Sequence, residues 1–582
     1  MVRDKLTGGF RSDPVYFLGL AVSAVALLVA AVFLLARPVV LHRFVLPFAE
    51  AFLSPDRIIE QNTVTLLDGF LVNMGSITLL LGIIAVCYSF IWRYFGSHLP
   101  EARYPTPIPS ILPVTKLEIC FLVTAMVVAL MLRLRHVTRG LTYDEIYSAI
   151  HFIEVDSIWQ TISSYSVFNN HIGYSILARF SQAILGRHEW ALRLPALLLG
   201  LGSVYCMWAV GRKFLGPRAA IAATFGLALS PVHVMWSVSA RGYTGMILFT
   251  LVSSYLYFEL LDRPTRLNAF TFIFASVAGI YFHLYAALVT LVQMLFLLAL
   301  ASREILANRC GRLLHVQSFR ALWLLFAAII PTALACYAPV FQTLVSNIDR
   351  YGHSGFRPLF PLEVIEYLAG STWERLAMPV VLVIVVALIS LRRRRSKEVS
   401  YWLLLYSVPV LTVWLVRPRF LYPRFFVYLL PYCILLATVG CLTVWGAASS
   451  LSRPMARYFL RGLCTALVVG VLSAWTVGSW NDVGTEGFRD AVRTMERDAT
   501  QFTGLCAIGG EAQLFQYYSE RHIQVLGSME GFQQFAERYP EVRCAYRHRL
   551  QDTPERRRMV EFLSENATAQ QLQNVTVFTY QR

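Results

Sequence analysis

Charged residues are scarce in this sequence. Asp, Glu, Lys and Arg together make up 15% of its 582 residues, and hydrophobic residues make up 56%. About a quarter of the residues of a soluble globular protein are charged, so this shortage excludes a soluble protein. The apolar residues form runs long enough to cross a bilayer, and such runs are helical because lipid offers the backbone no hydrogen-bond partner. The composition predicts a mainly α, polytopic transmembrane helical bundle.

Patterns typical of several other classes are also missing. The ten cysteines have no metal-ligand spacing, and the chain has neither an internal repeat nor a low-complexity tract. Gly509-Gly510 alone is a weak match to a glycine-rich phosphate loop. We therefore predict no metal and no cofactor. Cys506 and Cys544 share the C-terminal polar segment, where a disulfide can form on an oxidising side of the membrane.

Positive charge predicts how the chain is threaded. The formal net charge is +16, but the segment from Trp480 onward holds 12 Arg, no Lys and 14 acidic residues, so the basic excess lies among the apolar runs. Basic clusters beside spans mark the cytoplasmic side, and they form no single patch for a nucleic-acid partner. Arg37-Pro38 follows the first run where a cleavage motif would stand, which indicates a retained span rather than a signal peptide. We predict about thirteen spans in the inner (cytoplasmic) membrane, with the N-terminus inside and the C-terminal segment outside.

These spans divide the chain into three predicted domains. Residues 1–116 hold two extra N-terminal spans and an interfacial segment, residues 117–479 form the core, and residues 480–582 form an extracytoplasmic domain. Helix and strand patterns alternate in the last of these, which is typical of a small α/β domain. The predicted spans are Val15–Ala36, Met74–Trp92, Leu117–Leu134, Leu192–Val210, Ala219–Trp236, Thr244–Leu261, Leu267–Tyr281, Leu284–Leu300, Ala321–Tyr337, Leu376–Leu391, Tyr401–Val416, Phe425–Trp445 and Leu460–Gly478. The predicted strands of the last domain are Leu505–Ile508, Ile523–Leu526, Val542–Tyr546 and Val575–Tyr580.

An acidic pair lies just past the outer end of the third span. Asp144 and Glu145 stand among apolar and aromatic residues in Leu141-Thr-Tyr-Asp-Glu-Ile-Tyr147. A carboxylate held near a membrane cleft can act as a general base on an acceptor; the alternative is a solvated helix cap. Asn170 and His171 follow in the same loop, where the imidazole can position an acceptor or serve only the structure.

Arginines recur on the predicted outer side, where the positive-inside rule makes them rare. Arg241 precedes Tyr243 at the end of the fifth span, and Arg417, Arg419 and Arg424 lie between the eleventh and twelfth spans. Guanidinium groups match phosphate geometry, so these residues predict an anionic ligand, although one such arginine can simply snorkel. His283 and Tyr285 lie on the same side. Glu189 and Arg193, four residues apart, are predicted to pair on a helix face.

The order of these elements resembles the glycosyltransferase C superfamily, in particular the group of protein mannosyltransferases, aminoarabinose transferases and rhizobial lipopolysaccharide galacturonosyltransferases. The resemblance rests on the acidic pair, the Asn-His element, Gly186-x-x-Glu-x-x-x-Arg-x-Pro195, the Arg-x-Tyr and His-x-Tyr elements and the arginine segment 417–424. It covers roughly Leu117 to Gly478. The chain departs from it in two places: Asn170-His171-Ile172 replaces the His-Pro-Pro element of several relatives, and the two N-terminal spans are additional.

The resemblance implies an enzyme that moves a sugar from a polyprenyl-phosphate donor to an extracytoplasmic lipid, glycan or protein acceptor. It implies that Asp144 is the base with Glu145 as its support, that His171 lies near the acceptor, and that Arg241 and Arg424 neutralise the leaving lipid phosphate. The main alternative is a transporter or flippase of lipid-linked sugars. A transporter predicts ionisable residues at mid-membrane and related halves, whereas the charges of this sequence lie at span ends.

Overall fold

The computed structural model describes most of the chain from residue 113 onward. The described residues are 113–165, 169–262, 264–306, 316–341, 356–370, 396–418, 421–449, 454–481, 486–509, 512–548 and 553–582, with 81–91 and the single positions 21, 23, 24, 26, 93, 94, 343, 344 and 346. They form two compact units. Unit 1 takes its residues from 1–125, 202–227 and 245–468, and unit 2 from 126–201, 228–244 and 469–582. Most of the first predicted span, the whole tenth span and Arg419 lie outside the described residues.

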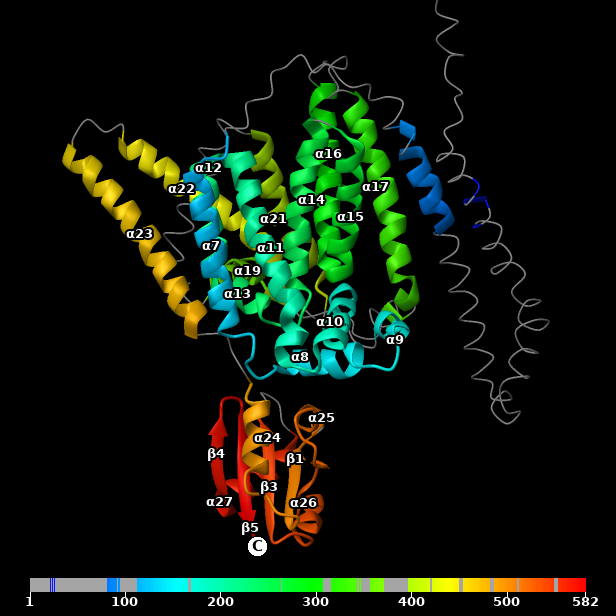
Figure 1. Ribbon diagram of the computed structural model, residues 1–582, viewed down its shortest axis with the longest axis vertical. Helices are drawn as coiled ribbons and strands as arrows, with labels where there is room; N and C mark the ends of the chain where they lie inside the picture. The colour runs from blue at the N-terminus through cyan, green and yellow to red at the C-terminus, as the bar shows by residue number, and fades with distance from the viewer. Residues whose placement is uncertain are drawn as a thin grey trace, which may run out of the picture. The chain divides into compact units, whose positions relative to one another are not determined.

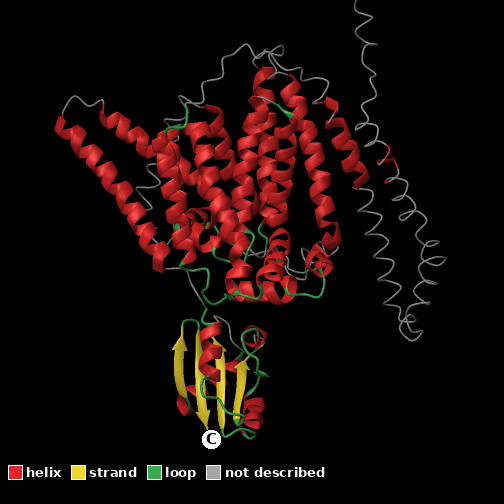
Figure 2. Cartoon of the chain, viewed as in Figure 1, coloured by secondary structure: helices red, strands yellow, loops and turns green. Residues whose placement is uncertain are grey.

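Among the described residues helices dominate, and every strand lies in the C-terminal part (Figure 2). Within the described ranges, six helices are long and apolar enough to cross a membrane: Lys116–Leu134, Glu189–Leu215, Tyr243–Asp262, Leu284–Ser302, Ala321–Val340 and Pro423–Ala448. These include α7 (Lys116–Leu134), α11 (Glu189–Leu215) and α14 (Tyr243–Asp262), which are labelled in Figure 1. The prediction of a mainly α, multi-pass membrane protein is confirmed, while the count of thirteen spans stays a prediction.

The predicted fifth span is broken. Helix α12 (Pro217–Leu229) and helix α13 (Pro231–Ser237) meet at Ser230 with a bend of 60°. Proline fixes φ and has no N–H for the preceding turn, so Pro231 starts a new helix. Helix α13 after the bend is short, and the segment 238–242 forms a tight turn before α14.

Unit 1 is a helical bundle whose interior is mostly hydrophobic and contains a few polar links between helices. Its remaining helices are α15 (Arg266–Phe282), α16 (Ala287–Leu306), α17 (Val316–Tyr337), α19 (Phe360–Ala369), α21 (Ser396–Val416) and α22 (Leu430–Ser449), with the 3₁₀ turns η3 (Leu284–Ala286) and η6 (Pro423–Leu429). The Gln293 amide donates to Ser253 Oγ at 2.8 Å, and the Tyr432 hydroxyl donates to Ser254 Oγ at 2.7 Å. Both bonds link different helices, as expected where apolar burial gives helices little attraction in lipid.

Unit 2 holds the loop that follows α7, which the sequence predicts to be an outer loop. The loop contains α8 (Tyr143–Ser148), the π turn η2 (Ala149–Ile153), α9 (Ile158–Ser163) and α10 (Ile172–Leu185). Arg133, in the last turn of α7, is completely buried; it donates to the Ala228 carbonyl at 3.2 Å and contacts His233 Nδ1 at 2.6 Å. Gly200 and Ser237 lie so close that a Cβ on Gly200 would meet Ser237 Oγ at 2.3 Å. These contacts fix α13 and the turn after it against α7 and α11.

The C-terminal part of unit 2 is a five-stranded sheet in the order β2-β1-β3-β5-β4. Strand β1 (Thr503–Ile508) pairs in parallel with β2 (Gln524–Leu526) and β3 (Glu541–Arg547), and β5 (Val575–Gln581) runs antiparallel to β3 and β4 (Thr568–Leu572). Helices α24 (Phe488–Glu496) and α27 (Pro554–Asn566) lie on opposite faces (Figure 1), with α25 (Ala512–Gln516) and α26 (Met529–Ala536) between the strands in sequence. The small C-terminal α/β sheet was predicted; β4 was missed.

Two cysteines face each other in this sheet. The β1–β3 register places Cys506 opposite Cys544, with the sulfur atoms 2.6 Å apart and both side chains fully buried. We predict that they form a disulfide when the domain lies on an oxidising side of the membrane. The cross-link closes a loop of 38 positions and is expected to stabilise the domain by about 3 kcal/mol.

The disulfide can be measured by alkylating the denatured, unreduced protein and weighing the peptides. We expect both sulfurs to be protected until reductant is added, and the Cys506→Ser variant to expose Cys544 as a free thiol. Full alkylation of both cysteines without reductant would contradict both the disulfide and the predicted side of the domain.

Candidate functional site

The acidic pair lies on α8, and its sequence sets the start of that helix. Thr142 is the N-cap, and Glu145 is the third residue of the helix. Glu145 Oε2 accepts the Thr142 N–H at 2.8 Å and the Thr142 hydroxyl at 3.0 Å, which is the reciprocal arrangement of a capping box. The spacing Thr-x-x-Glu therefore places the two acids in the first turn of a short helix.

Glu145 is completely buried and paired with Arg193. Arg193 Nε donates to Glu145 Oε1 at 2.7 Å, and Nη2 donates to Oε2 at 2.8 Å; both side chains have 0% exposure. The Ala240 N–H also donates to Oε1 at 2.8 Å. The remaining guanidinium hydrogens bind the carbonyls of Val137, Arg139 and Gly140. Glu145 thus joins α8 to α11 and to the turn after α13, and it is not a solvated cap.

The predicted pair of Glu189 with Arg193 is wrong. Glu189 instead accepts a salt bridge from Arg489 at 3.0 Å. Arg193 lies on the interior face of α11, where the buried Glu145 carboxylate satisfies it in bidentate geometry, and such geometry is stronger than an exposed pair along one helix.

The charge of Arg193 sets the pKa of Glu145. Burial alone raises the pKa, but the Arg193 charge and its hydrogen bonds, with help from Arg139 and the Thr142 N–H, bring the pKa to about 2 from the ordinary 4.5. A carboxyl whose pKa is lowered on folding adds stability above its unfolded pKa, and this stability is lost as the pH falls toward the folded pKa. The window for this loss is therefore pH 4.5 to 2.

We predict that acid destabilises the fold and that protonation of Glu145 accounts for a measurable part of the lost stability. Acidification from pH 4.5 to 2 is expected to remove stability of the order of 3 kcal/mol through this group. Melting temperatures of detergent-purified protein, recorded at several pH values, should fall less steeply for Glu145→Gln than for the unmodified chain. Parallel curves for the two proteins would show that Glu145 contributes nothing to the acid response.

Asp144 has a different environment from its neighbour. It is half-buried, whereas Glu145 is inaccessible. Adjacent helix residues lie about 100° apart around the axis, so the face of α8 that carries Asp144 is not the face that binds Arg193. The Asp144 carbonyl accepts the Ser148 hydroxyl at 2.8 Å. Of the two acids, Asp144 is therefore the partly accessible one, and Glu145 anchors the helix that carries it.

Arg241 holds α8 from the other side. It is 3% exposed; its Nη1 donates to Ser148 Oγ at 2.8 Å and to the Asn169 carbonyl at 3.1 Å, and its Nη2 donates to the Asn169 amide oxygen. Tyr243 is buried beside it, with ring centroids 5.1 Å from His171 and 3.9 Å from Trp236. Asp144, Glu145, His171, Arg241 and Tyr243 thus belong to one contiguous part of unit 2.

Asn170 connects two helices of the outer loop. Its amide donates to the carbonyls of Thr161 and Ser164 at 3.0 and 2.8 Å, and its oxygen accepts the Ser175 hydroxyl at 2.8 Å. The neighbouring Asn169 makes the contact with Arg241, which the sequence did not reveal. Both asparagines stand in the same Asn-Asn-His element, but Asn169 binds Arg241 and Asn170 binds α9 and α10.

A second group of predicted residues lies in unit 1. The rings of His283 and Tyr285 lie 5.3 and 4.8 Å from Phe425, and the Arg424 guanidinium lies 4.6 Å above the Tyr422 ring. His283 Nδ1 accepts the Tyr285 N–H at 3.3 Å. Arg417 ends α21 with a positive φ of 53°. The turn η3 and the start of η6 are therefore side by side, and the roles of these residues stay a prediction.

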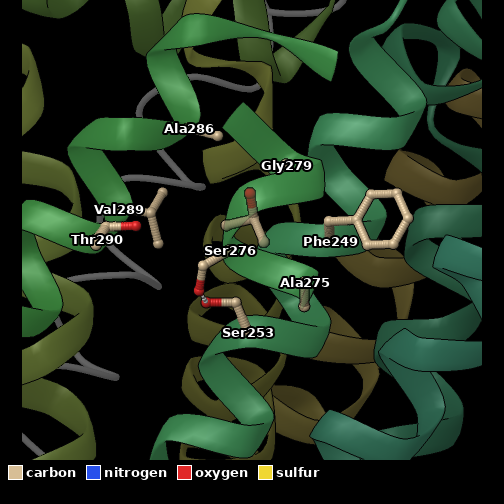
Figure 3. A pocket seen from close by; sticks show the side chains of 9 residues that line it. Phe249, Ser253, Ala275, Ser276, Gly279, Ala286, Val289 and Thr290 are labelled. Atoms are coloured by element: carbon tan, nitrogen blue, oxygen red, sulfur yellow. Dashed lines mark hydrogen bonds between the residues drawn. The ribbon is translucent and has the colours of Figure 1, made fainter. Parts of the chain in front are cut away.

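Unit 1 also contains a small pocket of about 10 Å³, no larger than a water molecule needs, between α14, α15, η3 and α16 (Figure 3). The Ser253 and Ser276 hydroxyls lie 3.4 Å apart in its wall. Ala286, next to Tyr285, reaches the same wall. Among the residues that the structure describes, no three His, Cys, Asp or Glu side chains are arranged to hold a metal ion.

Comparison with known proteins supports the resemblance to protein mannosyltransferases over part of the chain. Residues 172–331 match the family described as dolichyl-phosphate-mannose-protein mannosyltransferase. The "Putative mannosyltransferase YkcB" of Bacillus subtilis (strain 168) is 25% identical over 183 residues, or 31% of this chain and 26% of that protein, so the chain spans about a quarter of this relative's length.

Solved structures with similar folds include ArnT from Cupriavidus metallidurans in the apo state, with a TM-score of 0.48, 13% identity, and coverage of 79% of this chain and 97% of that chain. The Archaeoglobus fulgidus oligosaccharyltransferase has a TM-score of 0.45, 11% identity, and coverage of 73% and 67%.

Proposed function

We propose that this chain is a membrane glycosyltransferase that moves a sugar from a polyprenyl-phosphate donor to an extracytoplasmic acceptor, with Asp144 as the general base. The observation that carries the proposal is a reachable carboxylate on a helix fixed by two buried arginines, Arg193 and Arg241. Both arginines lie within residues 172–331, which match a family named after a lipid-phosphate sugar donor. Glu145 supports Asp144 by anchoring α8 and takes no part in proton transfer.

The chemistry needs a base and a site for a leaving phosphate. The acceptor oxygen attacks the anomeric carbon and gives its proton to Asp144, while the bond from that carbon to the phosphate oxygen breaks. The electron pair leaves with the lipid phosphate, so negative charge develops there and fixed positive groups stabilise it. We assign this role to Arg417, Arg419 and Arg424. Arg241, supported by Tyr243, shares it only if it exchanges its present partners for phosphate.

The acceptor side is proposed to include His171, His283 and Tyr285, with Asn170 holding the loop that presents His171. Imidazole and phenol groups can hydrogen-bond an acceptor hydroxyl and fix its orientation. A lipid, a glycan or a protein can each offer such a hydroxyl or an amine. Partners are therefore a lipid-linked sugar, its acceptor and the surrounding membrane lipid.

A transporter or flippase fits the charges less well. Arg212 pairs with Glu118 at 3.0 Å, and Lys213 pairs with Glu259, all near helix ends. The interior bonds described for unit 1 join neutral hydroxyl and amide groups rather than the ionisable residues that a transport path needs.

The test is sugar transfer by the purified full-length protein in lipid nanodiscs. Undecaprenyl-phosphate carrying radiolabelled mannose, glucose, galacturonate or aminoarabinose is supplied in turn with a cell-envelope extract as acceptor. We expect one donor to transfer its label, and Asp144→Asn to stop the transfer. Asp156→Asn, an exposed acid of the same loop, is the matched control. Movement of intact donor across sealed vesicles without any transfer would favour the flippase instead.

A further inference from the structure

The C-terminal domain contacts the main chain immediately before Asp144. The Leu141 N–H donates to the Tyr518 hydroxyl at 2.7 Å. The Thr142 N–H donates to Glu145, and the Tyr143 N–H donates to the Glu486 carboxylate. The first N–H groups of a helix have no partner within it. Here three successive amides have side-chain acceptors, and two of these acceptors come from beyond residue 480.

The Tyr143 side chain is held by the same part of the chain. The Arg547 guanidinium lies 4.7 Å above the Tyr143 ring and forms a salt bridge of 2.9 Å with Glu486. Glu486 and Arg547 thus bind Tyr143 through its backbone and its ring together. Tyr143 is the residue directly before Asp144, so its position determines where α8 begins.

Two further contacts fix the ends of the surrounding loop. Arg489 donates to the Thr138 carbonyl at 2.8 Å and pairs with Glu189. The Tyr517 hydroxyl donates to Glu154 at 2.7 Å, beyond the far end of η2. The contacts therefore extend from before α8 to after it. They come from strand β3, from helix α24 and from the segments next to α24 and α25.

We propose that the C-terminal domain is a positioning element of the transfer site, in which Glu486 and Arg547 set the place of Asp144. This inference rests on the proposed role of Asp144. Glu486 is a positioning residue and not a second base, because its carboxylate is committed to Arg547 and to the Tyr143 N–H.

The charges around Glu486 are consistent with this place in the site. Burial raises the pKa of Glu486, and the carboxylates of Asp144 and Glu145 raise it further, against the opposing effects of Arg547 and the Tyr143 N–H. Arg139 also lies within electrostatic range. A carboxyl that senses Asp144 in this way belongs to the same local environment, although more than 300 residues separate the two in sequence.

The test uses full-length variants in nanodiscs and two independent measurements. Hydrogen–deuterium exchange of peptides covering 138–148 reports the contact itself, and steady-state transfer from the active polyprenyl-phosphate sugar reports positioning. For Glu486→Ala we expect faster exchange at 138–148 and a kcat about tenfold lower with a nearly unchanged KM, because small misplacements of a reacting group act on kcat. Glu486→Gln keeps an acceptor for the Tyr143 N–H and is expected to stay within about threefold of the unmodified protein.

Arg543→Ala is the matched control. Arg543 lies on the same strand as Arg547, but it bonds Glu541 and carbonyls of α24 inside the C-terminal domain. It is expected to loosen the domain without changing kcat. Arg547→Ala should behave like Glu486→Ala.

Three results would overturn the proposal. If Glu486→Ala exchanges and reacts like the unmodified protein, the contact does not position Asp144. If Glu486→Gln is as inactive as Asp144→Asn, Glu486 takes part in proton transfer. If Arg543→Ala lowers kcat equally, only general stability matters. Absence of transfer by the unmodified chain with every donor would instead defeat the proposed function, and the positioning role would fall with it.

Discussion

Asp144→Asn is expected to lower the kcat of sugar transfer by a factor of about 10² to 10⁴, the usual contribution of a positioned general base. Asparagine has nearly the same shape and cannot accept the proton of the acceptor. Since Asp144 is half-buried and α8 is held through its other residues, Glu145 and Ser148 among them, the exchange should leave the fold intact. KM for the lipid-linked donor should change little, because the base interacts chiefly with the acceptor.

The measurement is steady-state transfer with the active donor, accompanied by the melting temperature of each protein. Asp156→Asn should retain full activity, which separates the loss of this base from any general effect of removing an acid from the outer loop. Transfer by Asp144→Asn at an undiminished rate would remove Asp144 from the mechanism.

Arg193→Ala is expected to be the most destabilising single change in unit 2, by about 3 to 5 kcal/mol. The substitution leaves the Glu145 carboxylate at 0% exposure without its counter-charge. It also removes the donors to the carbonyls of Val137, Arg139 and Gly140. We expect a large fall in melting temperature and in the yield of folded protein from membranes.

Arg179→Ala provides the comparison. Arg179 also donates to loop carbonyls, those of Ile153 and Val155. Among the residues that the structure describes, no buried acid forms a salt bridge with it, so its loss should cost only about 1 to 2 kcal/mol. The double variant Glu145→Gln with Arg193→Met should recover part of the stability lost in Arg193→Ala, because no isolated charge then remains buried. Equal melting temperatures for Arg193→Ala and Arg179→Ala would show that the buried pair is not a principal support.

The sequence predicts best those features that depend on local composition. Helices α7, α14 and α17 were found from apolar length, because a span must satisfy its backbone within itself. Strand β4 was missed because its residues are almost all exposed, so it shows no apolar alternation, and only its pairing with β5 holds it. The break at Ser230-Pro231 lies inside an apolar run whose length alone favoured one continuous span.

Residue types at the site could be chosen from the sequence, but their partners could not. Arginine, acidic and histidine residues near the predicted outer ends of spans stand out in the sequence. Charged side chains are costly to bury near a membrane, and the positive-inside rule makes arginines rare on the outer side. Arg193 pairs with Glu145 rather than with Glu189 because of how two segments 48 positions apart pack together. Glu486 contacts Tyr143 from almost 350 positions further along the chain, and no local sequence pattern predicts such a contact.

The buried carboxylate also places a demand on biogenesis. Glu145 receives its last hydrogen bond from Ala240, 95 positions further along the chain, and chains are made from the N-terminus. Arg193, 48 positions further along, supplies the counter-charge, so a polypeptide interrupted before Arg193 carries an unpaired carboxylate. One interrupted before the turn after α13 lacks a hydrogen bond to that carboxylate. An incomplete chain is thereby distinguishable from a finished one by a single ionised side chain, which gives cellular surveillance a physical feature to detect.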